Sequence, residues 1–397
     1  MLEYEAALER ILGSLPPPRR ETLPPDRALG RILAAAVVAP IDLLPFDNSA
    51  MDGYAVRAAD TQSPNAVLSL HGRVPAGEAA TAEVIAGACV RVFTGSRLPA
   101  GADAVIMQED TAPDPGDPRR IRVLEGVKPW ENVRFAGEDV KRGAGAAPAG
   151  AVVGAGLVHL LGALGVTQID VTLRPRVGLL ATGSELVVAG EPLPPGGIYE
   201  SNRAGLAALF TGAGADPRVF PLVKDTLADT RAALEAAFAE CDLLVTTGGV
   251  SVGELDFVKP AFQALGGTME FWKVAIRPGR PFVFGRWGDK YLFGLPGNPV
   301  SAFVTALLLV RPALRRWQGA ERVRLPEYGG VLTQPVANPG ERRHFVRVRL
   351  DDAGGVTPGR VQGSHILSSL AAANGLLDVA PRTTLPAGTA VRVACWE

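Results

Sequence analysis

Apolar and polar residues follow three different patterns along the chain, and each pattern predicts a different structure. Within residues 3–13, polar and apolar residues alternate at helical spacing, which predicts a helix. The prolines that follow end this helix because proline lacks an amide donor. Residues 47–139 contain short apolar runs between Gly, Pro and Asp turns, which is typical of an all-β module. Between residues 176 and 317 strand-like and helix-like segments alternate. This alternation predicts a mostly parallel sheet covered by helices on both faces.

The alternating region resolves into individual elements. Thr226 and Asp229 have the spacing of a capping box at the start of one helix. Asn298 followed by Pro299 is a good helix start as well. The predicted strands are 177–181, 218–223, 242–247, 268–275, 281–286 and 290–295, and the predicted helices are 203–212, 227–240, 256–265 and 299 to about 310.

We therefore predict a multidomain protein of class α/β plus β. Residues 46–139 form an inserted β domain, and residues 1–45 together with 140–172 form an elongated linker domain with a helix rich in Ala, Leu and Gly. Residues 173–320 form a doubly wound α/β domain. Residues 321–397 return to short strands and form a C-terminal β domain with a barrel-like sheet.

Composition excludes several classes of protein. The 397 residues carry 40 Lys and Arg against 41 Asp and Glu, which argues against a basic nucleic-acid binder and against an acidic, disordered chain. The three cysteines stand far apart, so neither a disulfide framework nor a zinc site is indicated. The N-terminus lacks the pattern of a secretory signal, and Gly, Pro or His interrupts the longest apolar stretches. We expect a cytoplasmic protein without nucleic-acid or membrane partners.

Three predicted strands end in glycine-containing loops. The loops are residues 183–185, 248–256 and 296–299. Glycine allows backbone amides to approach a phosphate closely, and ligands of open α/β sheets gather at the carboxyl ends of the strands. A single such turn is more often just a helix start, but three at one sheet edge favour an anion site. Its candidate residues are Gly248, Gly249, Ser251, Pro296, Gly297, Asn298 and Pro299.

Carboxylates lie beside these loops. Glu185, Asp225 and Asp256 each follow a predicted strand end. Acidic groups next to a phosphate cradle suggest Mg²⁺, which prefers one or two carboxylates together with phosphate oxygens and water. The alternative is that Asp225 and Asp256 simply cap helices, and for each residue alone this is at least as probable.

Cations are grouped in two other segments. Lys273, Arg277 and Arg280 surround a Pro-Gly turn, which suits recognition of a polyanion, although a solvated loop is an equal alternative. Near the C-terminus, Arg342, Arg343 and the turn at 363–365 offer further anion donors, with ordinary surface polarity as the alternative. The segment at 46–56 has the composition of a tight surface turn and indicates no function by itself.

Long strings of the sequence resemble one known family. The resemblance is to the molybdopterin molybdenumtransferases, a family that includes the E domain of gephyrin, and it extends from about residue 29 to 370. The strings are FDNSAMDGYAV, RVFTGSRLPAGADAVIMQED, VRFAGEDVKRG, ATGSEL, ESN, TTGGVSVGELDF, FWKVAIRPGRPF, LPGNPVSAF and QGSHILSS. It implies an elongated homodimer in which the α/β domain of one subunit faces the β domain of the other across a shared cleft. It also implies insertion of molybdenum from molybdate into adenylylated molybdopterin, with Mg²⁺ present and AMP released.

The resemblance also implies site residues. The family's acidic catalytic residues correspond to Asp52, Glu185, Asp225 and Asp256, of which the last three are the candidate metal ligands. Arg277 stands where lysine is frequent, and the string around Arg342 departs from the usual one. Residues matching substrate-binding positions are Thr94, Lys273, Arg277, Pro296, Pro299, Arg342 and Ser364, beside Gly248, Gly249, Ser251, Arg280, Gly297 and Asn298 from the loops and the cationic segment.

Two other functions remain open at this point. The α/β domain alone resembles a molybdopterin adenylyltransferase, and gephyrin also acts as a scaffold. The DNSAMDGY string argues against the first, and the complete acidic set argues against the second. Transient contacts with the adenylyltransferase and with molybdoenzymes are expected partners. The sequence does not distinguish molybdate from tungstate, nor does it assign each carboxylate to Mg²⁺ or to molybdate.

Overall fold

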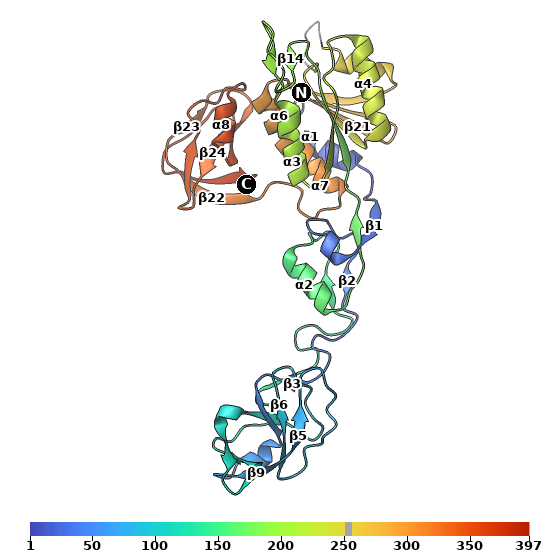
Figure 1. Cartoon of the computed structure of the whole chain (residues 1–397). Coiled ribbons are helices and arrows are strands. Elements are labelled where there is room, and N and C mark those ends of the chain that lie inside the picture. Colours follow the sequence, from blue (N-terminus) through green and yellow to red (C-terminus); the bar gives the residue numbers. More distant parts are fainter. Residues whose placement is uncertain (251–255, 397) are drawn as a thin grey trace.

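The computed structural model describes residues 1–250 and 256–396 of an elongated molecule (Figure 1). Residues 173–320, the α/β domain, and residues 321–396, the C-terminal domain, form one end. Residues 46–139, the distal β domain, form the other end. Residues 15–45 and 140–172, the linker domain, connect the two ends (Figure 1). The first helix, Tyr4–Ser14, falls in the predicted linker range 1–45 but packs against the α/β domain instead.

The α/β domain is built on a six-stranded mixed sheet. The strand order is β16-β13-β17-β21-β20-β18, in which the first four strands are parallel and the last two are antiparallel to their neighbours. This confirms the predicted mostly parallel α/β class. The strands are β13 (Arg176–Ala181), β16 (Asp216–Val219), β17 (Leu243–Thr247), β18 (Thr268–Trp272), β20 (Val283–Trp287) and β21 (Lys290–Leu295).

Helices bury both faces of this sheet. Leu179 and Val245 contribute to the core on one face, whereas their neighbours Leu180 and Leu244 contribute to the core on the other, as alternation along a strand requires. The first face packs against α1 (Tyr4–Ser14), α3 (Asn202–Gly212), α6 (Pro299–Thr305), the π-helical turn η4 (Ala306–Val310) and α7 (Arg311–Trp317); the second packs against α4 (Leu227–Glu240) and α5 (Val258–Ala264).

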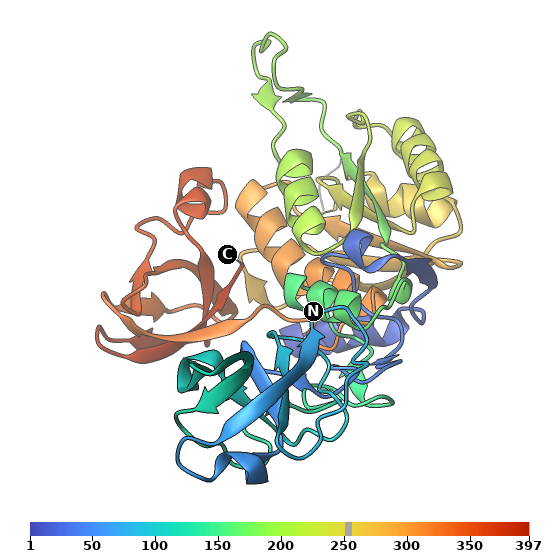
Figure 2. The same cartoon turned by 60° about the horizontal axis from the view of Figure 1, so that its bottom comes forward.

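β16 spans Asp216–Val219 instead of the predicted 218–223, and two further segments differ from the sequence-based expectation. The predicted strand 268–275 ends at Trp272, because Lys273 adopts a positive φ of 71° that turns the chain. The next residues form β19 (Ile276–Arg277), which pairs with the C-terminal domain instead. The second difference is an arm made of β14 (Leu186–Val187) and β15 (Ile198–Tyr199), which projects at the top of Figure 2.

The linker domain is formed by two stretches of chain that run side by side. Its pairs join β1 (Arg20–Leu23) to β12 (Ile169–Thr172) and β2 (Val37–Val38) to β11 (Gly145–Ala147). The short helices η1 (Pro25–Arg27) and α2 (Ala155–Ala163) pack around a small core that includes Ala28, Leu161 and Val171.

The distal β domain contains a six-stranded sheet in the order β7-β4-β6-β5-β9-β8. Its two apolar clusters lie on opposite sides of the strands, so that Ala55 faces one cluster and Val56 the other. Its elements are β3 (Asn48–Ser49), β4 (Gly53–Val56), η2 (Ala58–Thr61), β5 (Val67–Val74), β6 (Ala88–Val92), β7 (Ala104–Met107), η3 (Gln108–Asp110), β8 (Thr111–Asp114), β9 (Asp117–Val123) and β10 (Val133–Arg134).

The C-terminal domain contains a closed ring of strands. The ring runs β24-β25-β22-β28-β26 and returns to β24, and β19 of the α/β domain adds to its edge. This agrees with the predicted barrel-like sheet. The elements are β22 (Glu327–Leu332), β23 (Val336–Asn338), β24 (Arg343–Leu350), β25 (Gly355–Pro358), α8 (Leu367–Ala371), β26 (Gly375–Val379), β27 (Thr383–Leu385) and β28 (Ala390–Cys395). In the part of the chain that the structure describes, no helix is long and apolar enough to cross a bilayer.

Candidate active site

A cavity of about 660 Å³ lies at the carboxyl ends of the parallel strands of the α/β domain. The loops that follow β13, β17 and β21 all contribute to its wall, as the three-loop prediction requires. The start of α3, the arm made of β14 and β15, the loop after β16 and the C-terminal domain contribute as well. Among its lining residues are Thr182, Gly183, Glu185, Glu200, Asn202, Asp225, Thr247, Gly248, Gly249, Asp256, Gly297, Asn298, Pro299, His365 and Leu367. We call it the carboxyl-end cavity.

The loop after β17 depends on two glycines with positive φ. Gly248 has a φ of 83°, and a Cβ atom there would lie 2.6 Å from the carbonyl oxygen of Thr182. Gly249 has a φ of 65°, and its Cβ atom would lie 2.8 Å from the Oγ1 atom of Thr182. The loop after β17 therefore packs directly on the end of β13, which only glycine permits. Ser251, predicted from the same loop, lies outside the described residues.

Asn298 and Pro299 begin α6 as expected, but backbone groups at this helix start already form hydrogen bonds with other parts of the protein. Asn298 occupies the N-cap position without a side-chain capping bond. The N–H of Val300 donates to the backbone carbonyl of Ser364 at 3.1 Å, and the Nδ2 of Asn202 donates to the carbonyl of Gly297 at 2.8 Å. The loop thus connects α3, α6 and the C-terminal domain at the cavity.

Asp225 does not cap a helix. The N-cap of α4 is Thr226, whose Oγ1 accepts from the N–H of Asp229 at 3.1 Å, as the capping box predicts. The Oδ2 atom of Asp225 instead accepts from the N–H of Ser184 at 2.8 Å. This bond joins the loop after β13 to the loop after β16 and leaves the carboxylate at the cavity wall.

The carboxylates of Glu185, Asp225 and Asp256 share the cavity without forming a complete metal site by themselves. Within residues 1–250 and 256–396, no three His, Cys, Asp or Glu side chains are placed to hold a metal ion. The backbone carbonyl of Glu185 accepts from the N–H of Ile198 at 2.9 Å, but its carboxylate has no hydrogen-bond or ion-pair partner in these ranges. Thr182 Oγ1 is buried there without a partner. Because Mg²⁺ commonly takes only one or two carboxylates and completes its shell with phosphate and water, the donor set fits this ion.

Glu200 is an acidic cavity residue that sequence reasoning missed. Its carboxylate pairs with Arg203 at 2.7 Å, and both side chains are more than nine-tenths buried. The guanidinium of Arg203 also donates to the carbonyl of Phe220. Glu200 therefore holds the first turn of α3 against the sheet. The signals for this pair in the sequence were the i,i+3 spacing of the two residues and the ESN string that contains Glu200.

The predicted cations do not line the cavity within the described ranges. Arg342 donates to the carbonyl of Ile276 at 3.0 Å, and burial together with the nearby Arg280 and Arg277 lowers the pKa of Arg342. Lys273 places its ammonium 3.6 Å from the ring centre of Trp272. None of these four predicted cations belongs to the cavity lining within the described ranges, and neither do Pro296 and Ser364.

Arg343 differs from the expectation that it offers a free anion donor. Its guanidinium pairs with the carboxylates of Asp378 and Glu5. These pairs raise the pKa of Arg343 further above its ordinary value. Arg343 therefore connects the C-terminal domain to α1, and its charge is already compensated.

Asp52 and Thr94 lie together in the distal β domain, far from the carboxyl-end cavity (Figure 1). The Oδ1 atom of Asp52 accepts from the Thr94 N–H at 2.7 Å and from its hydroxyl at 2.9 Å. These bonds lower the pKa of Asp52, which is fully exposed. Within one chain the structure thus brings Asp52 to Thr94 but not to Glu185, Asp225 or Asp256.

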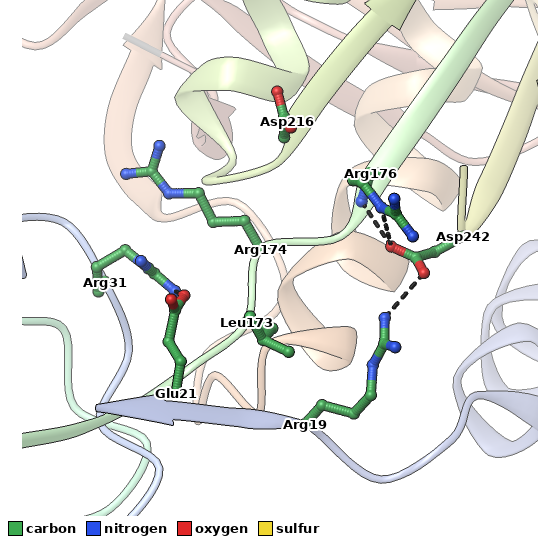
Figure 3. A pocket seen from close by; sticks show the side chains of 8 residues that line it. All are labelled: Arg19, Glu21, Arg31, Leu173, Arg174, Arg176, Asp216 and Asp242. Carbon is green, nitrogen blue, oxygen red and sulfur yellow. Dashed lines mark hydrogen bonds and ion pairs between the residues drawn. The ribbon is translucent and has the colours of Figure 1, made fainter. Parts of the chain in front are cut away.

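A second pocket, of about 470 Å³, lies at the opposite, amino end of the same sheet (Figure 3). Asp242 is buried there and binds Arg19 of the linker domain at 2.8 Å, and it also accepts from the N–H of Arg176 at 2.9 Å. Glu21 pairs with Arg31 across the same pocket. None of the predicted site residues lines this amino-end pocket within the described ranges.

Comparisons with known proteins cover nearly the whole chain. Residues 2–165 match the MoeA N-terminal region (domain I and II), residues 178–316 a probable molybdopterin binding domain, and residues 330–396 the MoeA C-terminal region (domain IV). The chain is 38% identical to the molybdopterin molybdenumtransferase of Haemophilus influenzae, over 94% of this chain and 93% of that protein. It is also 38% identical to molybdopterin molybdenumtransferase 2 of Mycobacterium tuberculosis, over 95% and 94%.

The fold comparison gives the same result. A crystal structure of the molybdopterin biosynthesis moeA protein from Pyrococcus horikoshii superposes with a TM-score of 0.86 at 32% identity and covers all of both chains. Fold and comparisons together define an enzyme of mixed α/β and β architecture, whose α/β domain matches a probable molybdopterin binding domain. The chain belongs to the molybdopterin molybdenumtransferase family.

Proposed function

We propose that this enzyme inserts molybdenum into molybdopterin during molybdenum cofactor biosynthesis, with molybdate and adenylylated molybdopterin as substrates and AMP as a product. The observation that carries the proposal is the carboxyl-end cavity, where Glu185, Asp225 and Asp256 lie beside the glycine turns of three strand ends. Such turns suit a phosphate, and the carboxylates suit a hard cation and a water molecule.

The residues divide the chemistry between them. Glycine turns at Gly248 and Gly249 bring backbone close to the adenylate phosphate, while a cavity carboxylate orients a water molecule and accepts its proton as the phosphoanhydride bond breaks. Glu185, Asp225 and Asp256 are the residues that would hold Mg²⁺, one or two of them directly. The ion, when bound, neutralises charge on the phosphate oxygens.

We further propose that the complete site needs a second copy of the chain. Asp52 and Thr94 belong to the family pattern but lie at the far end of the molecule from the cavity (Figure 1). In a symmetric dimer, the distal β domain of one subunit can reach the cavity of the other, and each cleft is then built from two chains.

An enzyme assay with defined substrates tests the proposed reaction. Purified protein is incubated with adenylylated molybdopterin, molybdate and Mg²⁺, and AMP is measured by chromatography while molybdenum in the pterin product is measured by mass spectrometry. Release of AMP that requires molybdate supports the proposal. Consumption of ATP with free molybdopterin would identify an adenylyltransferase instead. Peptide binding without either reaction would identify a scaffold.

Subunit mixing tests the shared cleft. Asp52→Ala and Asp256→Ala chains are each expected to be inactive. After exchange of subunits, half of the dimers contain one intact cleft out of two, so about a quarter of the wild-type activity should return. Glu341→Ala, at an exposed residue outside both regions, serves as the mixing control. Absence of recovery despite exchange shown by native mass spectrometry would contradict the shared cleft.

A further inference from the structure

Arg91 lies on β6 of the distal β domain, directly opposite Tyr54 of β4. Its guanidinium packs against two aromatic rings: the Cζ atom lies 4.9 Å from the ring centre of Tyr54 and 5.3 Å from that of Phe93. A guanidinium that stacks through its flat face keeps the N–H groups along its edge available. The two rings therefore hold Arg91 in place without occupying its hydrogen-bond donors.

Most of these donors have no partner in the part of the chain that the structure describes. Nη2 donates to the Oε1 of Gln108, and this is the one hydrogen bond of the Arg91 side chain within residues 1–250 and 256–396. In the same ranges no carboxylate forms an ion pair with Arg91, which is only partly exposed. A guanidinium with free donors and no carboxylate partner favours an anionic ligand.

Arg91 adjoins the predicted site residues Asp52 and Thr94. Phe93, which stacks on Arg91, directly precedes Thr94 in the chain. Gln108, which accepts from Arg91, donates through its backbone N–H to the carbonyl of Asp52 at 3.1 Å. The hydrogen bonds from Thr94 lower the pKa of Asp52 most, and the charge of Arg91 lowers it further. Asp52, Arg91 and Thr94 thus form one group, which we call the distal cluster.

The charge of the distal cluster complements that of the carboxyl-end cavity. Four carboxylates line the cavity, those of Glu185, Glu200, Asp225 and Asp256, whereas no Lys or Arg belongs to its lining within the described residues. A substrate with a phosphoanhydride brings further negative charge, which these carboxylates repel. An arginine that approaches from another chain offsets this repulsion, and its planar fork matches two phosphate oxygens.

We propose that Arg91 is a substrate-binding residue that acts in the cleft formed with a second copy of the chain, where its guanidinium contacts phosphate oxygens of adenylylated molybdopterin. The identity of this substrate and the shared cleft rest on the proposed function. Molybdate is also a tetrahedral oxyanion, so the experiments below separate the two sources. Arg91 and Asp52 then face the same ligand from the distal domain, the first as a cation and the second as a hydrogen-bonded carboxylate.

Three variants separate this role from folding. Arg91→Met removes the charge and keeps an apolar chain beside the two rings, whereas Arg91→Lys keeps the charge and loses the planar fork. Arg120→Met is the matched control, because Arg120 is an exposed arginine of β9 in the same sheet and forms no ion pair within the described ranges. Thermal unfolding shows whether each variant folds, and Arg91→Lys keeps the test available if Arg91→Met does not.

Binding is measured without turnover. Calorimetric titration uses inorganic pyrophosphate, and then adenylylated molybdopterin with molybdate and Mg²⁺ left out. Both affinities should fall about tenfold in Arg91→Met and about threefold in Arg91→Lys, and stay unchanged in Arg120→Met. In the AMP assay, the KM for adenylylated molybdopterin should rise about tenfold in Arg91→Met, while the KM for molybdate stays within about twofold of the wild type.

Subunit mixing shows in which cleft Arg91 acts. The substrate is kept well below its KM, so that Arg91→Met alone is nearly inactive. Mixed with Asp256→Ala chains, Arg91→Met chains should recover about a quarter of the wild-type activity, because one cleft of each mixed dimer is intact. Mixed with Asp52→Ala chains, they should recover none, because every cleft then contains one altered distal cluster.

Each contrary result has a distinct meaning. Unchanged affinity for both titrants in folded Arg91→Met would overturn the binding role. A raised KM for molybdate alone would overturn the assignment to phosphate. Recovery with Asp52→Ala but not with Asp256→Ala would place Arg91 at the cavity of its own chain and overturn its action across subunits. If the wild type releases no AMP, the proposed function fails, while the pyrophosphate titration still decides whether Arg91 binds phosphate.

Discussion

The two ends of the parallel sheet carry similar numbers of acidic residues but use them differently. At the amino end, Asp242 binds Arg19 and Arg176, and Glu21 binds Arg31, so each carboxylate is matched by a guanidinium (Figure 3). At the carboxyl end, Glu185 and Asp225 make no ion pair with Lys or Arg within the described residues, although both line a cavity. The pairs of Asp242 and Glu21 involve the linker domain, whereas the carboxylates of Glu185 and Asp225 are available to a ligand; Glu200, paired with Arg203, is the exception in the cavity.

The two ends of the sheet also differ in the backbone of their loops. At the carboxyl end, Gly248 and Gly249 adopt positive φ angles in a loop that touches Thr182. At the amino end, β13 begins directly after the linker segment, and the pocket is lined mostly by charged side chains instead. The difference shows that charge alone does not identify an active site in this protein, because four arginines line the pocket that holds the domains together.

The largest expected effect is loss of activity on neutralising a carboxylate of the cavity. Glu185→Gln should lower the rate of AMP release by about 100- to 1000-fold, because the proposed function assigns its carboxylate to the reacting groups and the side chain has no ion-pair partner within the described residues. Its thermal midpoint should stay within about 2 °C of the wild type. The matched control is Asp216→Asn at the amino-end pocket, whose half-exposed carboxylate pairs with Arg218 and should leave the rate unchanged.

The next effect is loss of stability at the amino end. Asp242→Ala leaves Arg19 and the N–H of Arg176 without their buried acceptor, so the free energy of unfolding should fall by about 3 kcal/mol. Urea unfolding followed by fluorescence measures this change. Arg19→Ala, which removes the half-exposed partner, should cost less than about 1 kcal/mol. Equal costs for the two variants would contradict the assignment of Asp242 as the buried centre of the contact.

A smaller effect concerns pH and the buried His344. Its pKa falls from an ordinary 6.5 to about 4 in the folded protein, chiefly because of burial. The unfolded chain therefore takes up the proton first. The stability due to the neutral ring is complete above about pH 6.5 and is lost as the pH falls to about 4, by roughly 2 to 3 kcal/mol in all. Unfolding free energies measured across this interval should show a shallower decline in His344→Phe, and parallel curves would contradict the prediction.

Local patterns predicted the elements of the α/β domain well. The helix at 227–240 and its capping box at Thr226 and Asp229 were confirmed, because both depend on neighbouring residues. The strand at 268–275 was wrong beyond Trp272, since the following residues pair with β24, about seventy positions away. Such pairing has no local signal.

The candidate site shows the same limit. The three glycine loops were expected at one edge because parallel strands end together, and the structure places them around one cavity. The burial of Arg347 and the pairing of Glu200 with Arg203 were not foreseen, because both depend on which segments meet in space. The roles of Asp52 and of the cavity carboxylates stay predictions that the mixing and AMP experiments test.

The chain enters and leaves the distal β domain at one place. Asn48 pairs with Arg134 and Ser49 with Val133, so the two crossing strands are already neighbours where the insertion begins. A short turn between them would close the remaining chain without moving the linker domain. In evolutionary terms, the distal domain is a cassette: a gene can acquire, exchange or lose it as one block, and the sheet that carries the cavity keeps its fold.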